Sequence, residues 1–145
     1  MGYRFSGFFI DQDDPQLVDR IRTRWPLLHA QPIHSPFLGY GFAFPDHERC
    51  LSDEEAEAIL EQRDSASDEL PVFSASYPDA TFLWVDADCF GGTCLYSGYG
   101  CRDGHILVKE ESPTTNSLRP LVQVFGVELR PDQYFSPFTR GFFRL

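Results

Sequence analysis

Two turn signals divide residues 81–111 into three short strand-like segments, and they constrain the fold more than any other feature of this chain. The dipeptides Gly91-Gly92 and Asp103-Gly104 are typical of two-residue hairpin loops, and each lies between runs of apolar residues. A two-residue loop joins antiparallel neighbours. Residues 81–111 are therefore predicted to form a three-stranded antiparallel meander at the centre of the fold.

The turns also set the register of this meander, because a two-residue loop determines which residues of the two strands face each other. The residues next to the turns are expected to pair as follows: Phe90 with Thr93, Cys89 with Cys94, and Arg102 with His105. One face then carries Leu83, Val85, Ala87, Cys89, Cys94, Tyr96, Gly98, Gly100 and Leu107. The other face carries Phe82, Trp84, Asp86, Asp88, Leu95, Ser97, Tyr99, Cys101, Ile106 and Val108. Both faces are partly apolar, which predicts that the sheet is covered on both sides for much of its length.

Glycines mark two further positions in the meander. Gly98 and Gly100 lie side by side on the first face, where a missing side chain leaves room for a helix, another backbone or a ligand. Packing of a helix is the more frequent use of such glycines, and we expect it here. The tight turn at Gly91 and Gly92 is expected to require a positive φ, which glycine adopts without steric cost.

Helices are predicted outside the meander. Asp14 and Pro15 provide an N-cap and a proline in the first turn for a helix over residues 15–24. Ser52, with a glutamate three residues later, forms a capping box that begins a second helix. Apolar residues at helical spacing predict a third helix over residues 117–125.

The second helix is expected to end near Arg63, because residues 65–69 are polar and are predicted to form a connection. Residues 70–77 fit a short helix or a strand, and we expect a helical turn that ends before a proline. Further strands are predicted over residues 3–10, 27–34 and 39–44. The tail, residues 134–145, is expected to pack on the core through Phe135, Phe138, Phe142 and Phe143.

These segments predict an α+β fold, with an antiparallel sheet built around the central three-stranded meander and about three helices. The length of 145 residues suits one domain, and we expect a single domain over residues 1–145. No apolar run approaches the length of a membrane span, and the first residues lack the apolar region of a signal peptide. We therefore expect a cytoplasmic protein that does not contact membranes.

The net charge of −10 is concentrated in one segment. Residues 46–69 contain ten acidic and two basic residues, a net −8 of the total. Phosphate recognition needs a basic surface, so nucleic acid is not expected as a partner. The outer face of the second helix is predicted to bind a basic protein partner through Asp53, Glu54, Glu57 and Glu61. The alternative is a solvated face that only keeps the protein soluble.

The spacing of the four cysteines does not match a zinc site. In the expected register Cys101 faces away from Cys94, whereas Cys89 and Cys94 are opposed at about 4.5 Å between Cα atoms, close enough for a disulfide after oxidation. A cytosolic protein keeps its thiols reduced, so we expect the resting pair to be reduced. Neither a metal nor a cofactor is expected.

Candidate catalytic groups do not converge in the sequence. Asp86 and Asp88 lie on one strand face about 7 Å apart at the backbone, an arrangement with which a magnesium site can begin, but no further acidic motif accompanies them. The histidines show no metal-ligand spacing. A nucleophile–base pair of Cys94 and His105 is disfavoured because the two lie at opposite ends of the meander strands. No catalytic residue is predicted.

Three passages carry a resemblance to known proteins: RWPLL…FLGYGFAFPD near the start, FLWVDADCFGGTC in the meander and NSLRPLVQVFGV near the end. They resemble small, mostly uncharacterised bacterial proteins that share a D-x-[FY]-G-G hairpin and a late amphipathic helix ending in G-V. The hairpin residues here are Asp88, Phe90, Gly91 and Gly92. Such proteins are similar in size and acidity to immunity proteins of bacterial toxin systems. The resemblance implies a binding role and provides no catalytic residues.

These observations favour a non-enzymatic interaction protein over an enzyme, because no set of catalytic residues converges. The main alternative is a small metal-dependent hydrolase that uses Asp86, Asp88 and a histidine. A regulatory subunit is a further alternative. Genomic context discriminates between them, since an adjacent toxin gene supports binding and an operon of metabolic enzymes supports catalysis.

Overall fold

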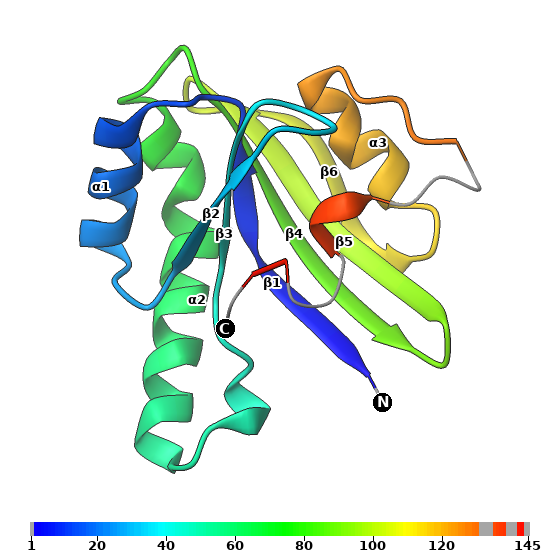
Figure 1. The fold of residues 1–145 in the computed structure, drawn as a ribbon. Coiled ribbons are helices and arrows are strands. Elements are labelled where there is room, and N and C mark those ends of the chain that lie inside the picture. Colours follow the sequence, from blue (N-terminus) through cyan, green and yellow to red (C-terminus); the bar gives the residue numbers. More distant parts are fainter. Residues whose placement is uncertain (1, 131–134, 139–141, 144–145) are drawn as a thin grey trace.

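A computed structural model describes residues 2–130, 135–138 and 142–143. These residues form the predicted α+β fold, in which six antiparallel strands belong to one sheet (Figure 1). The sheet is wider than the predicted central meander, and its strand order is β2-β3-β1-β4-β5-β6. The strands are β1 (Tyr3–Ile10), β2 (His29–Ile33), β3 (Gly39–Ala43), β4 (Thr81–Phe90), β5 (Thr93–Arg102) and β6 (His105–Thr114).

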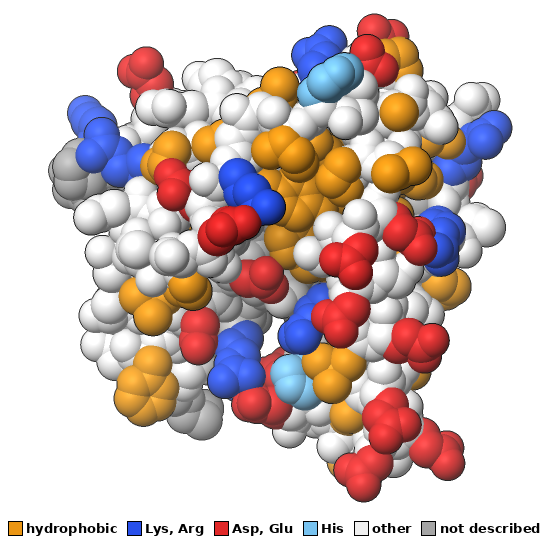
Figure 2. All heavy atoms as spheres, turned by 180° about the vertical axis from the view of Figure 1, so that it is seen from behind, with side chains coloured by type: hydrophobic (Ala, Val, Ile, Leu, Met, Phe, Trp, Pro, Cys, Tyr) orange, Lys and Arg blue, Asp and Glu red, His pale blue; other side chains and the backbone are white. Residues whose placement is uncertain are grey.

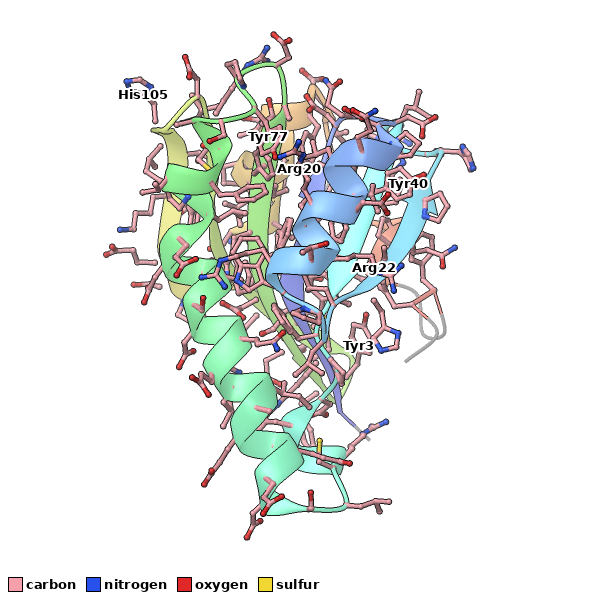
Figure 3. The ribbon with its side chains drawn as sticks, turned by 90° about the vertical axis from the view of Figure 1, so that its left-hand side faces the viewer. Tyr3, Arg20, Arg22, Tyr40, Tyr77 and His105 are labelled. Atoms are coloured by element: carbon pink, nitrogen blue, oxygen red, sulfur yellow. A yellow bond between two sulfur atoms is a disulfide. The ribbon has the colours of Figure 1, made fainter. Side chains whose placement is uncertain are left out.

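Helices cover both faces of the sheet, as the apolar character of both faces predicts. The helices α1 (Pro15–Arg24) and α2 (Asp53–Ser74) lie on one face, and α3 (Leu118–Val122) lies on the other (Figures 1 and 3). The short 3-10 turns are η1 (His47–Arg49), η2 (Gln123–Phe125) and η3 (Ser136–Phe138). None of the helices in the described part of the chain is both long and apolar enough to cross a bilayer.

The predicted register of the meander is confirmed at both turns. Phe90 pairs with Thr93, and Arg102 pairs with His105. Gly91 and Gly92 have φ angles of 60° and 81°, so the predicted positive φ is confirmed too.

The register prediction is wrong further along β6. A bulge lies between the Cys101–Ile106 and Gly100–Val108 pairs, and this extra residue moves Val108 to the face of Gly100. Leu107, predicted on that face, is 54% exposed. Side chains of β6 after the extra residue therefore lie on the opposite face of the sheet from the one predicted.

The helix packing predicted for the strand glycines is confirmed at Gly100, whereas Gly98 is approached by the backbone of a neighbouring strand. A Cβ atom at Gly100 would lie 2.7 Å from Cγ1 of Val124, which belongs to η2. A Cβ atom at Gly98 would lie 1.9 Å from the carbonyl oxygen of Trp84 on the neighbouring strand. Both positions therefore lack a side chain because protein atoms occupy the space.

Helix α2 is longer than predicted, and both the expected end near Arg63 and the polar connection over residues 65–69 are wrong. The helix continues to Ser74 with Pro71 inside it, and Ala66 and Leu70 are fully buried. Pro71 has no N–H to bond the carbonyl four residues before it. That carbonyl belongs to Ser67, and it accepts a hydrogen bond from the Tyr99 hydroxyl instead. A contact with β5 thus replaces the helical bond that proline removes.

The Phe-rich tail contributes to the core on the α3 face. Phe135, Phe138 and Phe143 are buried there, and Phe142 packs against them partly buried. The rings of Phe138 and Phe5 lie 5.0 Å apart between centroids. The predicted packing is confirmed for these residues, while residues 134, 139–141 and 144–145 of the predicted tail lie outside the described residues.

The cysteine pairing is confirmed, but the expected reduced state is wrong for this structure. Cys89 and Cys94 are opposed, with Cα atoms 3.9 Å apart, and are joined by a disulfide. Their place as a cross-strand pair beside a tight turn brings the two sulfur atoms together. Cys50 and Cys101 are free thiols, and Cys101 is fully buried.

Candidate functional site

The four predicted partner-binding residues lie together on the N-terminal half of α2. Asp53, Glu54, Glu57 and Glu61 are all exposed, and we call them the acidic face. Figure 2 shows acidic side chains gathered along the side of the molecule that this helix forms. Within the described part of the chain, none of the four makes an ion pair.

The start of α2 explains only part of this acidity. The Ser52 hydroxyl accepts a hydrogen bond from the Glu55 N–H at 3.2 Å, which caps the helix. Asp53 and Glu54 lie in the first turn, where a negative charge interacts favourably with the helix dipole. Glu57 and Glu61 lie beyond that turn and repel each other at a spacing of four residues. Helix stability therefore does not account for Glu57 and Glu61.

Several other acidic residues near α2 form ion pairs with arginines, whereas Glu55 and Asp68 form none among the described residues. Arg4 Nη1 lies 2.7 Å from Glu48, and Arg24 forms an ion pair with Glu69. Asp46 lies 3.7 Å from Arg49. Asp53, Glu54, Glu57 and Glu61 are thus four of the six acidic residues of the segment that have no ion pair among the described residues.

A polar hollow separates the N-terminal half of α2 from the sheet, and the sequence did not predict it. Arg4 of β1, His47 of η1 and Arg63 of α2 line a cavity of about 50 Å³ together with Ser6, Asp46 and the apolar residues Phe44, Pro45 and Ile59. Figure 2 shows a hollow on this face, bordered by basic, acidic and histidine side chains. These residues come from segments far apart in the chain. The available signal was the polar alternation of Arg4 and Ser6 at the start of a strand that is otherwise apolar.

The two aspartates considered for metal binding have protein partners. One oxygen of Asp86 accepts a hydrogen bond from the Trp84 indole N–H at 2.9 Å, and the other accepts one from the Ser6 hydroxyl. Asp88 is 61% exposed at its side chain and lies 3.7 Å from Arg4 Nε. No group of three His, Cys, Asp or Glu residues is placed to hold a metal ion in the part of the chain that the structure describes.

The candidate nucleophile and base do not meet. His105 lies beside the β5–β6 turn (Figure 3), whereas Cys94 follows the β4–β5 turn at the other end of β5. Cys94 is also joined to Cys89 in a disulfide. The described residues therefore provide no catalytic arrangement of the kind considered from the sequence.

An open groove lies beside the C-terminal half of α2, next to β5 and β6. It has a volume of about 300 Å³ and is lined by Ser67, Trp84, Asp86, Ser97, Gly98, Tyr99, Lys109, Glu110 and Glu111. Burial raises the pKa of Tyr99, and the negative charges of Asp68 and Asp86 act in the same direction. Lys109 Nζ lies 2.8 Å from Glu111, and this hydrogen bond lowers the pKa of the Glu111 carboxyl.

Comparison with family models, with curated proteins and with solved structures finds no significant match to this chain. The similarity to immunity proteins therefore stays a prediction from the sequence.

Proposed function

We propose that this protein is a non-enzymatic interaction protein whose acidic face docks a basic protein partner, as immunity proteins of bacterial toxin systems do. The observation that carries the proposal is the exposure of Glu57 and Glu61 without an ion-pair partner among the described residues. Their mutual repulsion weakens the helix slightly. A basic partner removes that repulsion when it binds.

The exposed charges act mainly on the encounter between the two proteins. Charges on a solvated surface steer association and are screened by salt, while buried apolar contacts supply most of the affinity. Leu51, which is 100% exposed directly before α2, is an apolar residue beside the acidic face. We propose that Leu51 is buried in the complex.

The test compares two variants with the same change in net charge. In the four-lysine variant Asp53, Glu54, Glu57 and Glu61 are replaced by lysine. In the control variant four exposed acidic residues elsewhere are replaced by lysine: Asp13, Asp19, Asp79 and Glu128. Each variant changes the net charge from −10 to −2.

The partner is captured from extracts of the source cell with the wild type and with both variants, and its amount is measured by mass spectrometry. A protein retained by the wild type and the control variant, but lost with the four-lysine variant, supports docking at the acidic face. Equal loss with both variants shows that only net charge matters, and that result contradicts the proposal.

The alternatives weighed from the sequence receive no separate support. A regulatory subunit would use the same exposed surface, and the capture experiment identifies its partner in the same way. No observation on the described residues favours a metal-dependent hydrolase at Asp86 and Asp88. The cytoplasmic location predicted from the sequence is part of the proposal.

A further inference from the structure

The groove beside Tyr99 combines an aromatic wall with carboxylates. Trp84 is 2% exposed and forms part of its base, and the ring of Tyr99 is partly buried beside it. Figure 2 shows hydrophobic side chains in the middle of this face, surrounded by charged ones. The Tyr99 hydroxyl donates to the Ser67 carbonyl of α2, so the ring is held in place before any ligand arrives.

The charge of the groove is negative. Asp86 and Glu111 contribute two carboxylates, and the only cation among its lining residues is Lys109, which is paired with Glu111. Each oxygen of Asp86 accepts one hydrogen bond from the protein, and a carboxylate oxygen can accept two. Asp86 therefore retains acceptor capacity for a ligand.

We propose that this groove binds the guanidinium group of an arginine side chain. A guanidinium is planar, donates to carboxylates in a fixed geometry and stacks on aromatic rings, and these are the groups that the groove presents. The inference rests on the proposed function, because the arginine is assigned to the basic partner that docks on the acidic face. The groove and the acidic face both involve α2, so one partner can contact both.

The two tryptophans of the chain provide a reporter and its control. The Trp84 indole N–H donates to Asp86 in the groove, whereas the Trp25 indole N–H donates to Ser65 Oγ at 3.3 Å. In ¹⁵N-labelled protein their two indole signals are resolved by NMR and assigned with the variant Trp25→Phe. The protein is titrated separately with ethylguanidinium, propylammonium and the neutral compound N-ethylurea.

The proposal predicts a saturable shift of the Trp84 signal with ethylguanidinium, a weaker response to propylammonium and none to N-ethylurea. The Trp25 signal is expected to stay in place. The absence of a saturable shift at Trp84, or an equal shift with N-ethylurea, overturns the site. An equal affinity for propylammonium overturns the assignment to guanidinium.

Variants test which carboxylates are responsible. Asp86→Asn is expected to weaken ethylguanidinium binding several-fold, but it also alters the contact with Trp84. Glu111→Gln changes only a charge at the open side of the groove, and it is also expected to weaken binding several-fold. Unchanged binding in Glu111→Gln and in Asp86→Asn contradicts the proposal.

The probe experiment is independent of the partner. Failure of ethylguanidinium to bind, together with loss of the partner in the four-lysine variant, removes this inference and leaves the proposed function intact. If ethylguanidinium binds but the four-lysine variant still captures the partner, the proposed function is contradicted and the guanidinium site is retained.

Discussion

The two halves of α2 differ in what they contribute. In the C-terminal half, Ala66 and Leu70 are fully buried, and Ser74 Oγ accepts a hydrogen bond from the Gly104 N–H at 3.0 Å. In the N-terminal half only Ile59 is buried, and the acidic face is exposed. The C-terminal half therefore fixes the helix to the sheet. The N-terminal half is not needed for this packing and can carry unpaired charges.

The largest expected effect is in the packed half. Leu70→Ala removes a fully buried side chain from the core between α2 and the sheet, and we expect a loss of about 2–5 kcal/mol in the free energy of unfolding. Denaturant unfolding measures it. Glu57→Ala, in the exposed half, is the matched substitution and is expected to change stability by less than about 0.5 kcal/mol. Similar losses in the two variants would contradict the division between the halves.

Alkaline pH is expected to lower the free energy of unfolding through Cys101, which contacts Ser74 in the C-terminal half of α2. Burial raises the pKa of the Cys101 thiol from about 9 to about 11, although a hydrogen bond with Ser74 acts in the opposite direction. Between these two pKa values the folded state holds a proton that the unfolded state has lost. This contribution to the free energy of unfolding is therefore complete below about pH 9 and disappears as the pH rises to about 11.

The free energy of unfolding, measured by denaturation across this range, should fall with increasing pH. The raised pKa of Tyr99 adds to the fall with the same sign. In Cys101→Ala the fall should be shallower. Identical slopes in the variant and the wild type would show that the buried thiol does not contribute.

The hairpin turn shows that exposure alone does not make a residue dispensable. A Cβ atom at Gly91 or Gly92 would meet nothing within 4 Å, so valine there has ample space. The positive φ of both residues is nevertheless unfavourable for valine, and each of Gly91→Val and Gly92→Val is expected to cost more than about 1 kcal/mol. Thermal melting decides it: if both variants melt within about a degree of the wild type, the backbone strain assigned to this turn is absent.

The smallest effect on stability is expected on the acidic face. Replacing Glu57 and Glu61 by glutamine removes the repulsion between them, with an expected gain of a few tenths of a kcal/mol. The four-lysine variant is expected to gain less, because lysine at positions 53 and 54 opposes the helix dipole in the first turn. Denaturant unfolding of both variants checks the order, and a clear loss in the glutamine variant would assign a structural role to these residues.

Local chemistry made much of the fold predictable. The Gly91-Gly92 turn set the pairing of β4 with β5 over its whole length, since nothing interrupts that ladder. No turn residue in the sequence marks the bulge at Leu107, so the register predicted for β6 is wrong from that residue onward. The polar residues 65–69 look like a connection by composition. Contacts with Trp25 and Tyr99 keep them helical, and such tertiary contacts cannot be derived from local propensity.

The same distinction applies to the candidate site. The acidic face could be predicted because helical periodicity alone places Asp53, Glu57 and Glu61 on one side. The polar hollow required the fold itself, because Arg4 and Arg63 meet only after β1 and α2 are placed on each other.

The association rate of the purified partner at low and high salt tests whether the acidic face docks that partner. Rates are measured for the wild type, the four-lysine variant and the control variant with equal net charge. Docking at the acidic face predicts fast, salt-sensitive association for the wild type, slow association with little salt dependence for the four-lysine variant, and nearly wild-type behaviour for the control. Equal rates and equal salt slopes in the wild type and the four-lysine variant would contradict it and reduce the acidic face to an aid to solubility.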